Sequence, residues 1–272
     1  MAPVRQDASH RPVHVQGAAP PGALAPQATP ATGPAARADA PRAVPDGFEA
    51  GKARTRRAGG GDAFETPAGL GPRQKRAYES LAPDQRSRFD QLAGAARADQ
   101  AHPAKSLKQV QSLLGSDGGF KHYDLIDQAL RSPGAQGGGR GEAPAELQRL
   151  LFSGRLTQGK SPLHQSALEH LGVLASQQRT ATGLDSHRLL ADTVLDLAHP
   201  ERIQQGQGNH DCGGTAAAVI LAKGKPAEYA RVVTELGTKG TATAGDQVWT
   251  ASQVKEKDGG GGRSLSQQLF AA

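Results

Sequence analysis

The chain has 272 residues and a net charge of +6, and its 35 glycines, 18 prolines and 4% aromatic residues leave too little packable side chain for a uniformly globular protein of this length. A single cysteine excludes an intramolecular disulfide framework. No apolar run is long enough to span a bilayer, so we expect no membrane-spanning segment.

Residues 1–72 have the composition of a disordered leader. Eleven of the 18 prolines fall in this stretch, among Ala, Gly, Gln and Arg, and no apolar periodicity interrupts them. The first residues, Met1 to Asp7, are not followed by the apolar stretch of a secretory signal peptide. We therefore expect a cytoplasmic protein, or one secreted without signal-peptide cleavage, as bacterial effectors with such leaders are.

The densest basic cluster, Lys52 to Arg57, raises nucleic-acid binding as a rival function. The cluster has no interleaved aromatic residues and no zinc-ligand pattern, so it offers attraction to phosphate without a means of reading sequence. A solvated run of charge explains the cluster more simply. We therefore do not expect a nucleic acid to be the partner.

From residue 73 to residue 198 the apolar spacing becomes helical. Spacings of three and four predict a short helix around 76–81, a second helix through Phe89, Leu92 and Ala96, and further helices over 106–114 and 120–130. The glycine-rich stretch 134–141 is predicted to be a flexible break. Leucine-rich stretches then predict more helices, and together a small bundle, over 147–152, 163–174 and 184–197.

Three histidines in this helical region do not suggest a metal site. His164, His170 and His187 lack the i, i+4 pairing and the carboxylate of a helical zinc site. We expect neither a metal nor a cofactor.

The only cysteine, Cys212, follows a glutamine- and glycine-rich loop and begins a predicted apolar helix over 212–223. At a helix N-terminus, free backbone N–H groups and the helix dipole stabilise a thiolate. The N–H of Cys212 and the side-chain amide of Gln205 or Gln207 could then donate to an oxyanion. A small buried hydrophobe, which is a common role of free cysteine, explains the residue equally well.

The segment Gln205-Gly206, followed by Asp211-Cys212-Gly213 and an alanine-rich helix, resembles the nucleophile segment of papain-like cysteine peptidases, including the bacteriocin-processing peptidase domains of ABC transporters. In those families a glutamine about six residues before the cysteine helps to form the oxyanion hole. Here Gln205 lies seven and Gln207 five residues before the cysteine. The segments 225–233 and 262–270 are similar to parts of uncharacterised bacterial proteins with such a core, so the resemblance covers the last quarter of the chain.

The catalytic base that the resemblance implies is missing from its usual place. Papain-like enzymes carry the catalytic His, and the Asp or Asn that orients it, after the cysteine, whereas none of the nine histidines here lies beyond Cys212. Either the chain is a shortened version of a longer domain, or an upstream His folds back, because a triad is defined in space. The upstream candidates are His187, His199 and His210. His199 precedes Pro200 and also suits a helix C-terminus.

Together these features predict an α+β fold that is mostly α. Its expected parts are a disordered leader over 1–72, a helical region over 73–198 and an incomplete papain-like segment over 199–272. In the last part we expect a helix over about 227–236, one or two strands within 237–254, a glycine loop over 258–262 and a core position for Trp249.

Two functions follow from this organisation. If the chain is an enzyme, Cys212 attacks a peptide or amide carbonyl and a His acts as base, so the partner is a protein or peptide substrate. The alternative is a noncatalytic helical interaction module, or an effector with a degenerate peptidase remnant, which binds a protein partner.

Overall fold

The computed structural model describes residues 67, 69–204, 212–251 and 264–271. These residues belong to one compact unit, Gly61–Ala272. Several predicted features lie outside the described residues: the leader up to residue 66, the basic cluster Lys52–Arg57, the loop residues Gln205, Gln207 and His210, and the glycine loop 258–262.

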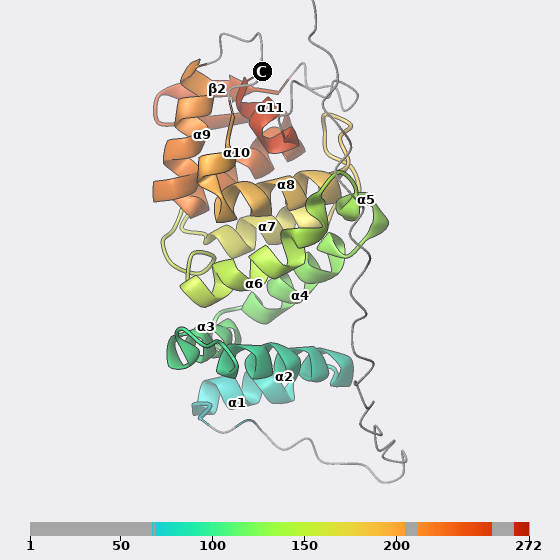
Figure 1. The fold of residues 1–272 in the computed structure, drawn as a ribbon, viewed down its shortest axis with the longest axis vertical. Coiled ribbons are helices and arrows are strands. Elements are labelled where there is room, and N and C mark those ends of the chain that lie inside the picture. The colour runs from blue at the N-terminus through green and yellow to red at the C-terminus, as the bar shows by residue number, and fades with distance from the viewer. Residues whose placement is uncertain (1–66, 68, 205–211, 252–263, 272) are drawn as a thin grey trace, which may run out of the picture. The chain divides into compact units, whose positions relative to one another are not determined.

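The unit is built mainly of helices, so the prediction of a mostly α fold with a small β component is confirmed (Figure 1). Two antiparallel strands, β1 (Thr241–Ala244) and β2 (Gln247–Thr250), pair Thr241 with Thr250 and Ala244 with Gln247. The elements are α1 (Pro72–Glu79), α2 (Pro83–Arg97), α3 (Pro103–Gly115), α4 (Gly119–Leu130), α5 (Pro133–Gln136), α6 (Ala143–Ser153), α7 (Ala167–Ala175), α8 (Ser186–Ala198), α9 (Cys212–Gly224), α10 (Pro226–Lys239), β1 (Thr241–Ala244), β2 (Gln247–Thr250) and α11 (Leu265–Ala271), with 3-10 turns at Arg140–Glu142 and Pro200–Arg202.

Most helix starts coincide with residues that favour a helix N-terminus. Helices α1, α2, α3, α5 and α10 begin at a proline, whose missing N–H would have no intrahelical acceptor at that position. Helix α7 begins with a capping box, in which Ser166 N donates to Glu169 Oε2 (2.7 Å) and Ser166 Oγ accepts from Glu169 N (3.4 Å). This cap corrects one prediction. The leucine-rich stretch 163–174 is helical only from Ala167, and Leu163 lies 54% exposed in the preceding turn together with His164.

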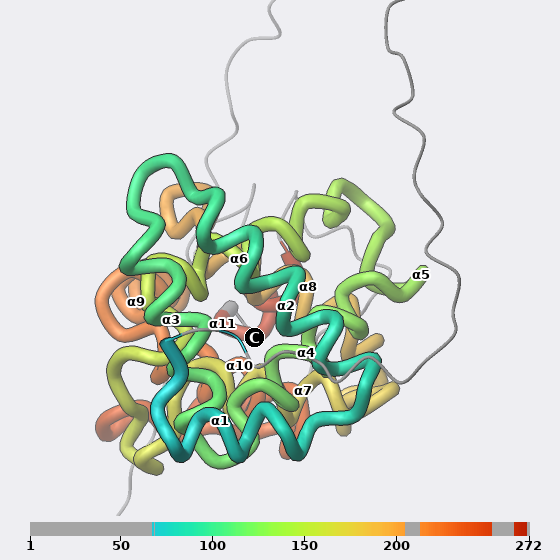
Figure 2. Tube along the Cα trace, turned by 90° about the horizontal axis from the view of Figure 1, so that it is seen from below, coloured from blue at the N-terminus to red at the C-terminus, as the bar shows by residue number. Residues whose placement is uncertain are grey.

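Helices α1, α2 and α3 pack together at one end of the unit, and Figure 2 looks onto that end. An aromatic cluster joins them to α4. The ring of Phe89 meets Tyr78 at 5.7 Å and Phe120 at 5.3 Å between centroids, both edge to face. Helix α3 also contacts α6, which connects this end to the remaining helices.

Helix α10 lies at the centre of the other part of the unit. It packs against α7, α8, α9, α11 and β1, and its side chains Tyr229, Val232, Val233 and Leu236 are fully buried. The helices before and after residue 198 therefore share one core. No helix within the described ranges is both long and apolar enough to cross a membrane.

The glycine-rich stretch 134–141 is ordered, which corrects the prediction of a flexible break. It contains most of α5 and most of a 3-10 turn, and Gly138 and Gly139 adopt positive φ angles of 67° and 82° that favour glycine. Arg140 then anchors the segment, because its guanidinium donates to both carboxylate oxygens of Asp192 on α8 at 2.5 and 3.2 Å. This ion pair joins residues far apart in the chain, so glycine content alone does not reveal it.

Candidate functional site

The predicted nucleophile, Cys212, is the first residue of α9, as expected from the sequence. The 13-residue helix is held by its buried residues Ala218 and Ala222 and contacts α8, α10, α11 and the Pro200–Arg202 turn. The side chain of Cys212 lies outside the described part of the structure, as do the candidate oxyanion donors Gln205 and Gln207. The thiol and its oxyanion donors therefore stay a prediction.

His199 ends α8, as its position before Pro200 predicts, and its N–H donates to Leu195 O at 2.8 Å. Each ring nitrogen faces a carboxylate. His199 Nδ1 lies 3.2 Å from Glu201 Oε1, and Nε2 lies 3.4 Å from Glu146 Oε1, an ion-pair distance without hydrogen-bond geometry. Glu146 is buried on α6 and also accepts from Arg149 Nη1 at 2.6 Å. The imidazole is thus oriented between two acids.

The other upstream histidines are placed differently. His187 lies in the first turn of α8, about 18 Å along the helix from His199, and its Nδ1 contacts Ser132 Oγ at 3.0 Å. His210 lies outside the described residues. The Pro200–Arg202 turn, which directly follows His199, contacts α9. His199 directly precedes this turn, whereas His187 lies at the start of α8, which also contacts α9.

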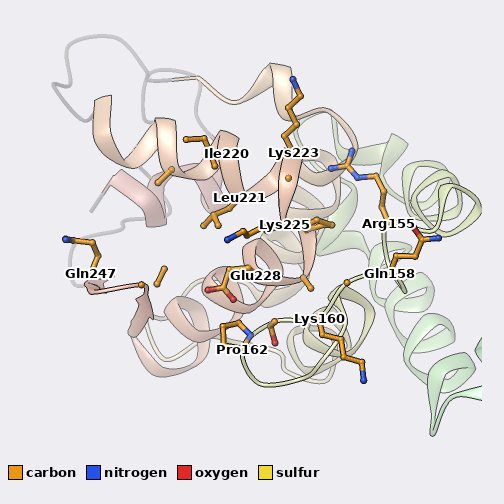
Figure 3. A pocket seen from close by; sticks show the side chains of 18 of the residues that line it. Arg155, Gln158, Lys160, Pro162, Ile220, Leu221, Lys223, Lys225, Glu228 and Gln247 are labelled. Carbon is orange, nitrogen blue, oxygen red and sulfur yellow. The ribbon is translucent and has the colours of Figure 1, made fainter.

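A groove of about 1150 Å³ runs along the second half of α9 (Figure 3). Four segments line it: the loop 155–162 after α6, residues 217–224 of α9, the turn and first residues of α10 over 225–228, and the hairpin over 244–249. Cys212 is at the other end of α9, about 7 Å along the axis from Ala217, the first residue of this helix to line the groove.

Arg155 ties two walls of this groove together. Its Nη2 donates a hydrogen bond to Ala222 O at 2.5 Å. This carbonyl is in the last turn of α9, where carbonyl groups accept no hydrogen bond from within the helix. Partial burial lowers the pKa of Arg155 below its ordinary value, but an arginine stays charged at any physiological pH. The contact therefore fixes the 155–162 loop on the end of α9.

The other end of the 155–162 loop is held by a contact between Ser161 and His170. Ser161 Oγ lies 2.9 Å from Nε2 of the buried His170 on α7, and the turn closes on itself through Ser161 N and Gln165 O at 2.8 Å. Burial, followed by the positive charge of Arg231, lowers the pKa of His170 below its ordinary value. The ring is thus neutral near pH 7, and this contact shapes the groove wall.

The hairpin wall depends on the buried Arg231 of α10. Its guanidinium donates to Glu228 at 2.7 and 2.8 Å, and it also donates to Glu235 and to the backbone oxygen of Thr243 on β1. Hydrogen bonding to Glu228 raises the pKa of Arg231. Glu228 lines the groove, but its charge is matched by this arginine.

Trp249 closes the groove on the hairpin side and packs partly into the core, as expected. Its ring meets Phe270 of α11 edge to face at 5.2 Å, and Phe270 stacks on Tyr229 of α10 at 5.3 Å between centroids. The aromatic row thus connects β2, α11 and α10.

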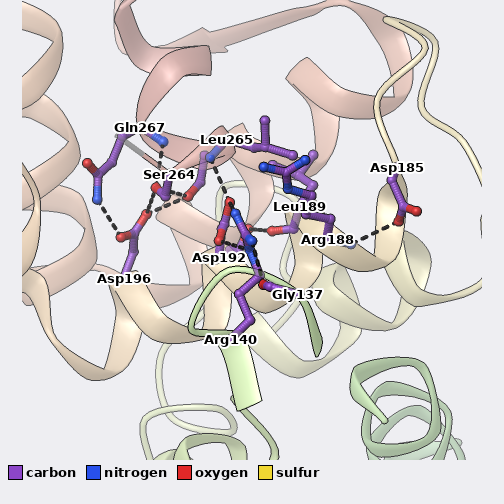
Figure 4. Close-up of polar contacts among 12 residues, drawn as sticks. Gly137, Arg140, Asp185, Arg188, Leu189, Asp192, Asp196, Ser264, Leu265 and Gln267 are labelled. Atoms are coloured by element: carbon purple, nitrogen blue, oxygen red, sulfur yellow. Dashed lines mark hydrogen bonds and ion pairs between the residues drawn. The ribbon is translucent and has the colours of Figure 1, made fainter. Parts of the chain in front are cut away.

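A buried polar cluster fastens α11 to α8, and the sequence reading missed it (Figure 4). Asp196 accepts hydrogen bonds from Tyr229 Oη (2.8 Å), Ser264 Oγ (3.1 Å), Ser266 Oγ (2.5 Å) and Gln267 Nε2 (2.8 Å). One turn earlier, Asp192 accepts from Leu265 N at 2.7 Å, in addition to Arg140. Burial raises the pKa of Asp196 above its ordinary value. The sequence feature that could have indicated this cluster is the pair Asp192 and Asp196, four residues apart in an otherwise apolar helix.

Among residues 67, 69–204, 212–251 and 264–271, no three His, Cys, Asp or Glu side chains gather in a way that could hold a metal ion. A scan against protein-family models, a search of curated proteins and a search of solved structures found no match for this chain.

Proposed function

We propose that this chain is a thiol hydrolase of a peptide or amide bond, with Cys212 as its nucleophile. The observation that carries the proposal is the place of Cys212 as the first residue of α9. A helix of 13 residues presents free N–H groups and a partial positive charge at this position, which favours a thiolate. The buried contacts of Ala218 and Ala222 hold the helix in place.

The proposed reaction has two steps. The thiolate of Cys212 attacks the carbonyl carbon, and the negative charge on the carbonyl oxygen is bound by the Cys212 N–H and the amide of Gln205 or Gln207. His199, protonated on forming the thiolate, gives its proton to the leaving amine as the C–N bond breaks. Water then hydrolyses the thioester and regenerates the thiol. Glu201, 70% exposed, can leave His199 Nδ1 at little cost, whereas Glu146 stays as the orienting acid.

The test is the pH dependence of iodoacetamide alkylation in the full chain. Cys212 is the only cysteine, so the mass gain reports on this thiol alone, and Cys212→Ala provides the blank. The proposal expects an apparent thiol pKa well below the ordinary value of about 8.5. An ordinary or unreactive thiol contradicts it.

The second candidate is a noncatalytic interaction module that binds a protein partner. The groove favours this candidate, because its lining begins in the middle of α9 and extends away from Cys212 over the α10 turn and the hairpin. In that case the groove binds its partner whether or not the thiol reacts, and an ordinary thiol pKa together with groove binding would identify this function.

A further inference from the structure

Four basic side chains line the groove along α9. Arg155, Lys160, Lys223 and Lys225 line it, and the three lysines are exposed and form no ion pair with any described carboxylate. Among the lining residues that the structure describes, Glu228 is the one acidic residue, and its carboxylate is bound by Arg231 at 2.7 Å. The groove therefore has an excess of positive charge.

The groove also has an apolar surface beside these cations. Ile220 is 67% exposed. It is one of five large apolar side chains that are exposed among the described residues. Ala217, Leu221 and Pro226 extend the same surface along the groove. In Figure 3, Lys225 reaches over the groove near Leu221 and Glu228, while Lys160 and Lys223 extend outward on opposite sides. An apolar side chain bound here would thus lie beside Lys225.

We propose that this groove binds an acidic peptide segment of a partner protein, with an apolar side chain of the peptide placed on Ile220 and Leu221. Carboxylates on either side of that side chain would pair with Lys225 and with Lys223 or Lys160. Burial of Ile220 supplies the hydrophobic part of the binding free energy, and the lysines supply charge selectivity. This inference deepens the interaction-module candidate and does not depend on catalysis by Cys212.

The lining favours a peptide over a single-stranded nucleic acid. Nucleic acids on such surfaces stack successive bases on exposed aromatic rings. Trp249 is the aromatic residue in the described lining, and its ring is engaged edge to face with Phe270. Isoleucine, leucine and proline side chains suit an aliphatic or aromatic peptide side chain instead.

The first experiment measures binding to the full chain by fluorescence anisotropy. The probe is a short fluorescein-labelled peptide in which leucines alternate with glutamates, and its counterpart has glutamine at every glutamate position. A labelled oligothymidine of similar length tests the nucleic-acid alternative. We expect the glutamate peptide to bind at least about tenfold more tightly than the glutamine peptide, and its affinity to fall as salt is added.

Variants then locate the site. Lys223→Glu combined with Lys225→Glu is expected to weaken binding of the glutamate peptide about tenfold or more. The matched control is Lys105→Glu with Lys108→Glu, two exposed lysines of α3 that do not line the groove, which should leave binding unchanged. Ile220→Ser should weaken both peptides, and its exposure means that the change leaves no cavity in the core. Circular dichroism confirms that each variant is folded.

Three results would overturn the proposal: equal binding of the two peptides, equal loss in the groove and control variants, or tighter binding of oligothymidine through the same lysines. Cys212→Ser should bind the glutamate peptide normally, and the groove variants should keep the thiol pKa of the unmodified chain. Peptide binding therefore tests the groove proposal, and the thiol pKa separately tests the thiol hydrolase proposal.

Discussion

Ser266 on α11 donates a hydrogen bond to Asp196 on α8, with 2.5 Å between Ser266 Oγ and Asp196 Oδ2. The two residues are 70 positions apart, and both are buried. Tyr229 of α10 donates to the same carboxylate oxygen, so one aspartate joins three helices. The last helix of the unit is therefore held by specific polar contacts in addition to its apolar face.

Substitution of Asp196 by alanine is expected to destabilise the unit by about 3 kcal/mol, because four donors lose their acceptor in a buried place. Urea unfolding at pH 7 measures the loss, and amide exchange over 265–270 should rise. Asp117→Ala, at an exposed ion pair, is the control and should change stability by less than about 0.5 kcal/mol. Equal effects of the two substitutions would contradict this role for Asp196.

Arg140 has a comparable role for the segment that the sequence predicted to be flexible. Arg140→Met would leave the buried carboxylate of Asp192 without its cation, and we expect a loss of about 3 kcal/mol. The segment around Gly138 and Gly139 should then become sensitive to proteases under conditions in which the unmodified chain is resistant. Arg73→Met, at an exposed ion pair, is the matched control. Unchanged proteolysis in Arg140→Met would show that the glycine turn is ordered without the ion pair.

These two contacts show where sequence reasoning succeeds and where it stops. The three-to-four spacing of Val110, Leu113 and Leu114 predicts α3, because burial of one helix face is a local pattern. The ion pair of Arg140 with Asp192 connects positions 52 residues apart, and no local pattern identifies such a partner. The same holds for the groove, whose walls come from four separate segments. The start of α9 at Cys212 was predictable from its loop and apolar helix, whereas the position of a base for the thiol depends on tertiary folding.

The buried imidazole of His170 should make stability depend on pH. Burial lowers its pKa in the folded state, so on acidification the unfolded chain binds a proton before the folded chain does. The groups that face this ring are Arg231, Glu228 and Glu235 of α10 and Glu169 of α7. The contribution of His170 is therefore complete above about pH 6.5 and is lost as the pH falls below that value. His170→Gln should lose less stability than the unmodified chain between pH 7.5 and pH 5.5.

Urea unfolding at the two pH values measures this difference. An identical pH dependence in His170→Gln and the unmodified chain would mean that His170 is protonated alike in the folded and unfolded states.

If His199 is the base of the proposed hydrolase, Glu146 positions it. Glu146→Gln removes the buried charge 3.4 Å from His199 Nε2. We then expect Cys212 alkylation at pH 7 to slow severalfold, because the imidazole loses the buried carboxylate that positions it. Glu79→Gln, an exposed residue of α1, is the control and should leave the rate unchanged. Equal alkylation rates in Glu146→Gln and the control, over a full pH profile, would remove Glu146 from the proposed machinery.

The aromatic row of Trp249, Phe270 and Tyr229 gives a spectroscopic test of how α11 is held. Phe270→Ala should cost about 3 to 4 kcal/mol, because it opens a cavity between the stacked Tyr229 and the edge of Trp249. Trp249 is the only tryptophan, so the emission maximum should shift to the red as its ring gains contact with water. Phe152→Ala, at a half-buried position on α6, should cost less and leave the emission unchanged. An unshifted spectrum in Phe270→Ala would mean that the hairpin, and not α11, shields the tryptophan.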